Sequence, residues 1–506
     1  MKVIAMYLPQ FHQVRENDQW WGEGFTEWTA VRGAKQLYKN HNQPRIPLDK
    51  NYYNLLEYET MSWQAKLMKK YGIDGLCMYH YWFKDGKRIL EKPAENLLEW
   101  KDIPMPFCFC WANETWARSW SNIQNKNIWA DRYEKEEKTC ENGILLEQKY
   151  GREKQWKDHF EYLLPFFLDE RYIKIDGRPL FLIYKTLDFF CLMEMIDYWK
   201  GLAKLHSLPD IYVVGQESNT PGKDYLDANL NFQPARAMEQ IPTPGRYARN
   251  GVKIWEYDDV WNEILREKTS DRVFLEGFVG YDNTPRHGIN GHVVEHSSPE
   301  KFSSYFTELL AKSAAYEKNI VFLNAWNEWG EGMYLEPDEN CGDGYLNAVS
   351  IAKNNYVYLI DKYRYIEKIN RENDLKNDRR VEKRISKDQY YLHILDHWMT
   401  LRENNFSIEH WLKNEKCKRI AVYGYGILGK HLCSELHGGD ITVEYIIDQK
   451  KGDISIDYKL YLPTEAIPET DAVIVTAIFD YDKIYKKLKN KGICKIISLE
   501  TILYEN

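Results

Sequence analysis

Glu328 and Glu331 are the residues whose type and spacing best suit chemistry. They stand three positions apart in the segment IVFLNAWNEWGEGMYLEP, where an apolar strand-like run gives way to a loop. Two carboxylates can divide the roles of acid and base when their surroundings separate their pKa values, and such a pair flanking one bond is the arrangement that cleaves glycosides. Trp326 and Trp329 would provide an apolar wall beside the pair. Two alternatives stay open, namely a solvated Glu-x-x-Glu loop and a divalent metal held together with Glu336.

The aromatic residues are concentrated in one part of the chain. Trp, Tyr and Phe make up 15% of the 506 residues, and ten of the 18 Trp precede residue 130 while none follows Trp411. Aromatic rings stack on the C–H faces of sugars, so loops rich in these residues suit a glycan ligand. We expect one side of a sugar-binding mouth to carry Trp20, Trp21, Trp28, Trp82, Trp111 and Trp116.

Eight strand-like runs precede residue 330 and alternate with helix-like segments. Most are apolar on both alternations, as expected for strands buried on both faces. This pattern predicts an α/β fold with a (β/α)8 TIM-type barrel, and a doubly wound sheet is the competing topology. The runs are residues 3–9, 73–82, 105–113, 179–185, 211–217, 228–234, 273–279 and 320–329.

The carboxyl ends of the predicted strands supply the other candidate site residues. A barrel gathers its functional side chains at these ends, and polar groups stand at all eight of them. For the histidines a satisfied structural role is the alternative, and for Asp282 it is an ion pair with Arg286 in the same turn. The expected sugar contacts, besides the two Trp next to the Glu pair, are His12, Glu27, Trp28, His80, Trp82, Trp111, Asn113, Glu114, Gln216, Asp282, Asn327 and Glu336.

Composition excludes several classes of protein. The formal charge of −8 argues against a nucleic-acid partner, which would require a basic surface. The start MKVIAMYLPQFH does not have the pattern of a signal peptide, and no run of 18 apolar residues occurs. We therefore expect a cytoplasmic protein without a transmembrane segment, whose nine cysteines are free thiols. A peripheral association with a lipid-linked glycan at the membrane stays open.

The C-terminal part has a different character. Residues 366–416 are rich in charge of both signs and predict a helical linker. Within residues 417–506, Gly424, Gly426 and Gly429 fit the pattern G-x-G-x-x-G, and Asp448 ends the next strand-like run. Backbone amides in such a turn can approach a pyrophosphate at a helix N-terminus, which predicts a Rossmann-like domain for a nucleotide or nucleotide-sugar. The alternative is that the glycines only allow the strand and helix to pack closely.

The first 365 residues resemble the WbsX-like glycosyltransferase family, whose barrel is similar to that of glycoside hydrolase family 99. The resemblance runs through the barrel in order and does not extend to the C-terminal part. It is carried by YLPQFH (7–12), NDQWWGEGFTEW (17–28), HYWF (80–83), CWANETWARSW (110–120), YDNTPR (281–286) and NAWNEWGEGMYLEP (324–337).

The resemblance implies roles for the two glutamates. Glu328 would be the base that removes the proton of a sugar 2-hydroxyl, which then attacks C1 and gives a 1,2-anhydro sugar with net retention. Glu331 would be the acid that protonates the leaving oxygen. The chain departs from the hydrolases at Gly330, where they often have His, and this change removes a polar contact near the site.

The resemblance and the motifs predict a glycosyltransferase or glycoside hydrolase of cell-surface polysaccharide (O-antigen or capsule) biosynthesis. Its substrate would be an oligosaccharide or polysaccharide, and the barrel itself would need no cofactor. Two alternatives remain: a nucleotide-dependent oxidoreductase that uses the glycine motif, and a non-catalytic barrel that binds glycans.

Overall fold

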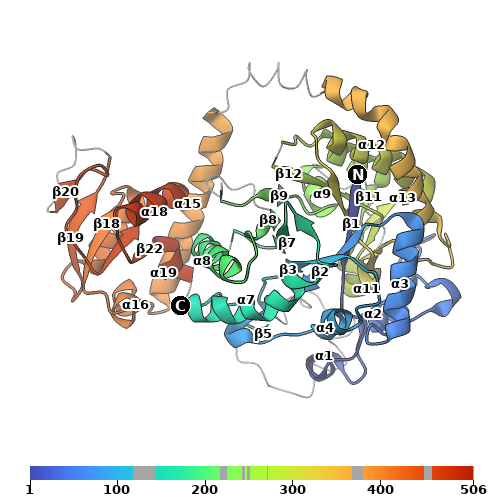
Figure 1. Ribbon diagram of the computed structural model, residues 1–506, viewed down its shortest axis with the longest axis horizontal. Helices are drawn as coiled ribbons and strands as arrows, with labels where there is room; N and C mark the ends of the chain where they lie inside the picture. Colours follow the sequence, from blue (N-terminus) through green and yellow to red (C-terminus); the bar gives the residue numbers. More distant parts are fainter. Residues whose placement is uncertain are drawn as a thin grey trace. The chain divides into compact units, whose positions relative to one another are not determined.

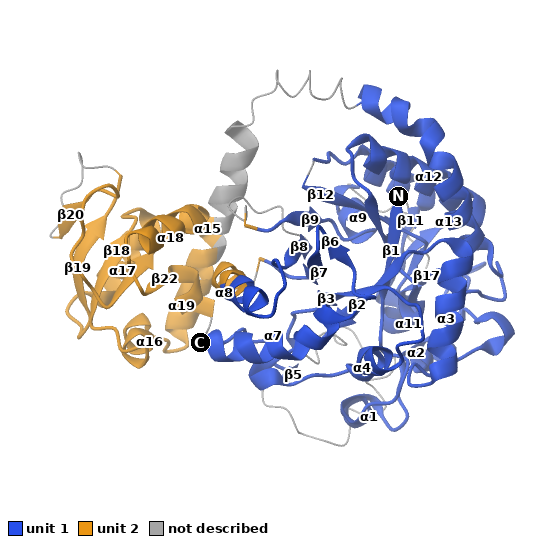
Figure 2. Cartoon of the chain, viewed as in Figure 1, with its two compact units in different colours: residues 1–186, 198–218, 226–373 blue, residues 187–197, 219–225, 374–506 orange. Residues whose placement is uncertain are grey.

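The computed structural model describes residues 1–117, 144–187, 189–216, 225–241, 246–247, 251–270, 272–366, 380–449 and 458–504. The chain divides into two compact units, which Figure 2 shows in different colours. The first unit comprises residues 1–186, 198–218 and 226–373, and the second comprises residues 187–197, 219–225 and 374–506. Residues 118–120, which end one of the stretches that carry the family resemblance, lie outside the described residues.

Eight parallel strands close into a barrel in the first unit (Figure 1). Pairing of the third strand with the fourth along the chain, Cys110 opposite Leu182, completes the circle and excludes the doubly wound alternative. Each predicted strand is present, and every residue of the third and the last is buried. The strands are β1 (Lys2–Tyr7), β2 (Gly75–His80), β3 (Phe107–Trp111), β7 (Arg178–Ile183), β8 (Tyr212–Gln216), β9 (Ala228–Leu230), β12 (Val273–Phe278) and β15 (Ile320–Asn324).

Helices between the strands follow local signals in the sequence. Helix α3 (Tyr58–Tyr71) ends at Gly72, whose φ of 79° is the left-handed conformation that glycine adopts easily. Helix α12 (Pro299–Ala315) begins at Ser298, whose side chain accepts a hydrogen bond from the Lys301 amide. The others are α1 (Arg15–Trp21), α2 (Glu27–Gly33), α4 (Lys92–Glu99), α7 (Glu153–Leu168), α8 (Leu192–Leu205), α9 (Ala235–Gln240), α10 (Tyr257–Arg266), α11 (Thr284–His287) and α13 (Gly344–Asn355).

Short strands and 3-10 turns build many of the loops between the barrel strands and the helices. Strand β16 (Asn327–Glu328) leads directly into the 3-10 turn Trp329–Glu331 and pairs with β17 (Met333–Tyr334). No helix among the described residues is long and apolar enough to cross a membrane. The remaining short strands are β4 (Trp116–Ala117), β5 (Ile144–Leu146), β6 (Lys174–Ile175), β10 (Arg246–Tyr247), β11 (Lys253–Glu256), β13 (Tyr281–Asp282) and β14 (His292–Glu295).

The second unit is built on a five-stranded parallel sheet in the order β20-β19-β18-β21-β22, which is consistent with a Rossmann-like domain. Part of the expected linker, residues 367–379, lies outside the described residues. The rest forms α15 (Arg380–Glu403) and α16 (Ile408–Asn414), and their Ile394, Trp398 and Leu412 belong to the core of this unit. Its other elements are β18 (Arg419–Tyr423), α17 (Ile427–Leu436), β19 (Thr442–Ile447), β20 (Lys459–Tyr461), β21 (Ala472–Val475), α18 (Tyr481–Asn490), β22 (Ile496–Ser498) and α19 (Leu499–Tyr504).

The glycine motif of the second unit meets a backbone requirement. Gly424 has a φ of 96°, and a Cβ added at Gly429 would lie 2.1 Å from the Gly424 carbonyl oxygen. By contrast, a Cβ at Gly426 would meet nothing within 4 Å. The Asp448 carboxylate accepts a hydrogen bond of 2.7 Å from the Tyr425 amide in the same turn. Close packing of strand on helix therefore explains two of the three glycines and leaves Gly426 without a structural reason.

Candidate active site

Three carboxylates converge on one guanidinium above the barrel. Arg286 donates from Nε to Glu27 Oε1 at 2.8 Å, from Nη2 to Glu328 Oε2 at 2.9 Å, and from Nη1 to Glu331. Nη2 also lies 2.7 Å from Glu27 Oε1. We call Arg286, Glu27, Glu328 and Glu331 the Arg286 cluster. It joins the predicted carboxylate pair to a third carboxylate from a distant part of the chain.

Each member of the cluster is held by a short element after a barrel strand. Glu27 is the first residue of α2, and its amide donates to the Gln10 carbonyl just beyond β1. Arg286 belongs to α11, which follows β12. Glu328 ends β16 and Glu331 ends the 3-10 turn after β15. The cluster therefore assembles at the carboxyl ends of three strands that are neighbours in the barrel, β12, β15 and β1.

The charges in the cluster do not balance, because one guanidinium faces three carboxylates. Burial, together with the charges of Glu331 and Glu27, raises the pKa of Glu328 to about 8, although Arg286 acts in the opposite direction. The Glu328 side chain is 8% exposed, whereas that of Glu331 is 23% exposed. The pair is thus unequal in environment, and in the free protein Glu328 is the member that burial keeps protonated at neutral pH.

Gly330 leaves room for the cluster. A Cβ added at this residue would lie 1.8 Å from Glu27 Oε1 and 2.9 Å from Arg286 Nε. The space beside Gly330 is therefore occupied by a charged pair from two other loops. From the sequence we expected that Gly330, where the hydrolases often have His, removes a polar contact near the site. The structure instead places the polar Glu27–Arg286 pair in the space beside Gly330.

The cluster lines a cavity of about 450 Å³. Trp, Tyr and Phe make up eight of its 19 lining residues, and of these Tyr79 and Tyr81 come from the end of β2 and the residue just after it. An aromatic cavity with a few converging polar groups is typical of a small-ligand site, and the volume suits sugar units. The other aromatic walls are Trp21, Phe25, Trp116, Tyr184, Phe232 and Tyr281.

Four of the predicted site residues line this cavity: Glu27, Glu114, Glu328 and Glu331. Trp21 and Trp116, expected at the sugar-binding mouth, line it as well. Direct contact between any of these side chains and a sugar stays a prediction.

Trp326, Trp329 and Glu336 are not at this mouth. The Glu336 carboxylate lies behind it, buried, and accepts hydrogen bonds from the two indoles at 2.8 and 2.7 Å. It also accepts from Gln64 Nε2 at 2.7 Å and from the Tyr53 hydroxyl at 2.8 Å. Because Glu336 is occupied by four donors, it does not converge with the other two glutamates on a metal. Among the described residues no cluster of His, Cys, Asp and Glu has the geometry to hold a metal ion.

His80, Trp82 and Trp111 pack between the barrel and helix α7, away from the cavity. His80 Nε2 lies 2.8 Å from His159 Nε2, and Trp82 stacks on the His159 ring. The Trp111 indole donates to the Trp82 carbonyl at 3.1 Å. Side chains alternate along a strand, so Tyr79 faces the cavity and His80 faces the helices. Burial lowers the pKa of His80 to about 3, which keeps the ring neutral.

The remaining predicted contacts are engaged within the fold. His12 is the exception, because it is buried with neither ring nitrogen hydrogen-bonded to a described residue. Trp28 is also buried, and its indole donates to the Tyr53 carbonyl. Asn327 bonds the Leu8 backbone through both side-chain atoms. Asn113 bonds the Lys185 backbone in the same way, and the buried Gln216 lies against Cys110.

Asp282 is also a structural residue. Its carboxylate accepts hydrogen bonds from His41 Nε2 at 2.9 Å and from Gln43 Nε2 at 2.8 Å, and the Thr284 hydroxyl donates to it as well. The expected ion pair between Asp282 and Arg286 is therefore wrong, because Arg286 points to the three glutamates. Sequence reasoning missed Arg286 as the centre of the site and missed Tyr79 and Tyr81 as its walls. The alternation around His80 was the signal that could have found the tyrosines.

The sequence matches the family described as Glycosyltransferase WbsX over residues 3–349. The chain belongs to the WbsX glycosyltransferase family. The matched residues contain all of the barrel strands apart from Lys2, and they contain the Arg286 cluster. Two curated relatives are the WxcX proteins of two strains of Xanthomonas campestris pv. campestris, each 31% identical over 361 residues. The alignment covers 69% of this chain and 49% of each relative, so the chain spans about half their length.

Solved structures similar to this WbsX-family chain include glycoside hydrolases. One is the GH99 endo-alpha-mannosidase from Bacteroides thetaiotaomicron, with a TM-score of 0.39, 12% identity, and coverage of 72% of this chain and 98% of that one. Another is a glycoside hydrolase-like protein, with a TM-score of 0.42, 12% identity, and coverage of 69% and 93%.

Proposed function

We propose that the chain cleaves or transfers a glycosidic bond in cell-surface polysaccharide biosynthesis, with Glu328 as base and Glu331 as acid. The observation that carries this proposal is the Arg286 cluster, which holds two unequally buried carboxylates at one aromatic cavity. Its substrate is an oligosaccharide or polysaccharide, as membership in the WbsX family supports.

The geometry suits a reaction through the sugar 2-hydroxyl. A carboxylate whose pKa is raised by burial is a stronger base once ionised, which favours removal of a proton from an alcohol. Proton transfer to Glu328 also relieves the excess of negative charge around Arg286. The more exposed Glu331 must enter the reaction protonated: it gives its proton to the leaving oxygen, and the resulting carboxylate then takes a proton from the water or sugar hydroxyl that opens the 1,2-anhydro intermediate.

The charge of the cavity favours an uncharged sugar donor over a nucleotide-activated one. Glu27, Glu328 and Glu331 face the guanidinium of Arg286, and Glu114, which also lines the cavity, lies 3.8 Å from Lys185 Nζ. His287 also lines the cavity, and burial lowers its pKa, which favours the neutral ring. A diphosphate would be repelled by this excess of carboxylates. We therefore propose that the bond broken belongs to a glycoside.

A glycoside that lacks the 2-hydroxyl should not react. We expect the 2-deoxy analogue of any glycoside turned over by the full chain to lose at least about 10³-fold in kcat/KM, because the attacking group is missing. Product NMR of the normal substrate should show retention at C1. Turnover of the 2-deoxy analogue at a comparable rate, or inversion at C1, would exclude this mechanism.

Activity should rise with pH through about 8. The base must be ionised, and the pKa of Glu328 in the free protein is about 8, so kcat/KM of Glu331→Gln on an aryl glycoside, which needs no acid, should increase between pH 6 and that value. Stability should change in the opposite sense. Because the folded pKa is raised from 4.5, the folded state holds the proton more tightly, and the contribution of Glu328 to unfolding free energy falls from pH 4.5 to about 8. A pH series of urea unfolding on the wild type and Glu328→Gln measures it, and identical slopes would contradict the assignment.

For the second unit we propose a nucleotide or nucleotide-sugar at the turn of Gly424 and Gly426. The glycine turn and the start of α17 support it, as does the open space at Gly426. Titration with UDP-sugars and NAD, followed by thermal shift, should raise the melting temperature, and Gly426→Ala should abolish the shift without unfolding the protein. A shift with NAD alone would favour the oxidoreductase alternative, and no shift would remove the proposal.

A further inference from the structure

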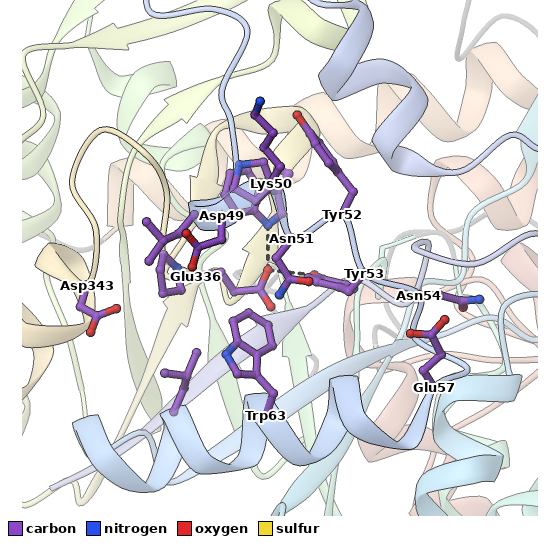
Figure 3. Close-up of a pocket in the computed structure, with 15 residues that line it drawn as sticks. Asp49, Lys50, Asn51, Tyr52, Tyr53, Asn54, Glu57, Trp63, Glu336 and Asp343 are labelled. Atoms are coloured by element: carbon purple, nitrogen blue, oxygen red, sulfur yellow. Dashed lines mark hydrogen bonds between the residues drawn. The ribbon is translucent and has the colours of Figure 1, made fainter.

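A second cavity, of about 650 Å³, shares a wall with the catalytic one. Glu328 and Glu331 line the first cavity, whereas Trp329, between them in the chain, lines the second. The rest of the second cavity is formed by residues 47–54, Glu57, Trp63 and Leu67 of helix α3, Glu336, Pro337 and Asp343 (Figure 3). The segment that carries the two catalytic carboxylates therefore separates two hollows in the first unit.

An aromatic side chain with an unused donor faces this second cavity. Trp63 rises from α3 toward the residues 49–53 and is half-buried (Figure 3). Its ring lies 6.0 Å from that of Tyr53, and no described residue accepts a hydrogen bond from its indole N–H. A tryptophan packed inside a protein normally finds a partner for this group. Here both the ring and the N–H are available to a ligand.

Polar side chains beside Trp63 are also without partners. Asp49 and Asn51 are exposed, make no side-chain hydrogen bond or ion pair with any described residue, and both line the cavity. Asp49 and Lys50 have φ values of 55° and 54°, the left-handed region that costs a non-glycine residue roughly 1 kcal/mol or more.

We infer that this second cavity binds a saccharide unit of the glycan. Sugar hydroxyls donate and accept hydrogen bonds at once, and the lining offers an acceptor in Asp49, a donor in Trp63 and both in Asn51. The Trp63 ring supplies an apolar face for the C–H side of the sugar. Among the lining residues Lys50 stands against the carboxyl groups of Asp49, Glu57, Glu336 and Asp343, so the lining disfavours an anionic saccharide. The volume lies within the range of about 300–1,000 Å³ typical of small-ligand pockets.

A saccharide held here would lie beside the catalytic wall without touching its carboxylates. The site uses none of the residues of the Arg286 cluster, so the two proposals can fail separately. The chain would then bind its glycan in two cavities, one on each side of the 328–331 segment.

Glycan binding by the full chain tests this inference. Glu328→Gln stops turnover, and an array of hexose and N-acetylhexosamine oligosaccharides of defined sequence is the probe, with calorimetry on those retained. Adding Trp63→Ala should weaken binding about tenfold, because it removes the stacking face. Adding Asp49→Gly should weaken it several-fold while preserving the fold, because glycine adopts the left-handed φ without strain.

Two controls separate the outcomes. Trp100→Ala removes another half-buried tryptophan outside both cavities and should leave affinity unchanged. Trp21→Ala acts on the catalytic cavity alone. Three results would each overturn the second site. They are unchanged affinity in Trp63→Ala and Asp49→Gly, loss of binding only in Trp21→Ala, and an array on which no glycan is retained. None of these results would affect wild-type turnover, by which the proposed function is judged.

Discussion

Replacing Glu328 or Glu331 with glutamine should reduce turnover of a glycan by about 10³-fold or more while the protein stays folded. Each substitution removes one of the two groups that exchange protons with the sugar. Folding should survive because the pKa of Glu328 is about 8, so at neutral pH the fold already accommodates an uncharged group there. Glutamine also keeps a carbonyl oxygen that can accept from Arg286 Nη2, which lies 2.9 Å from Glu328 Oε2.

The two variants should differ with the leaving group. An aryl glycoside with an acidic phenol does not need protonation, so Glu331→Gln should regain much of its rate on such a substrate and Glu328→Gln should not. Glu161→Gln, on the exposed face of α7, is the matched control and should leave activity unchanged. Full activity in both variants would mean that the Arg286 cluster is not the catalytic site.

Adding a single methyl group at Gly330 should disrupt the same site by steric overlap with Glu27. In Gly330→Ala the new Cβ would lie 1.8 Å from Glu27 Oε1, so the Glu27–Arg286 pair must move. Overpacking of this kind costs about 3 kcal/mol, and displacement of Arg286 would also release Glu328 and Glu331. We expect a loss of unfolding free energy near that value together with a loss of activity, measured by urea unfolding and by kcat/KM.

A second substitution distinguishes the clash from other effects. Combining Gly330→Ala with Glu27→Ala removes the atom that the new Cβ meets, so stability should recover more than the two single changes predict by addition. Gly201→Ala, within α8 and with nothing within 4 Å of the added Cβ, should instead stabilise the protein by about 0.5–1 kcal/mol. A Gly330→Ala variant as stable and active as the wild type would show that the cluster does not require this space.

Much of the fold could be read from the sequence because strand signals are local. All eight predicted strands are present. Ser298 stands at the start of α12 and Gly72 at the end of α3, as the sequence around each of them predicted. A run such as FCFCW is apolar on both alternations, and this property marks a strand of a barrel without any knowledge of its partners. The wrong expectations concern faces and contacts. His80 and Trp82 stand near a strand end as predicted, but they pack against α7.

The sequence by itself determined the barrel, the family and the carboxylate pair, since these depend on neighbours along the chain. Only the tertiary structure decided which groups surround that pair. Glu27 and Arg286 are 259 residues apart and meet because closure of the barrel brings the loops after β1 and β12 to either side of β15. Side chains alternate between the two faces of a strand, but closure of the barrel decides which of the two sets faces the cavity. As a result Tyr79 faces inward and His80 faces outward. The neighbour of Glu328 and Glu331 is the Arg286 guanidinium, whereas the sequence suggested a wall of tryptophans.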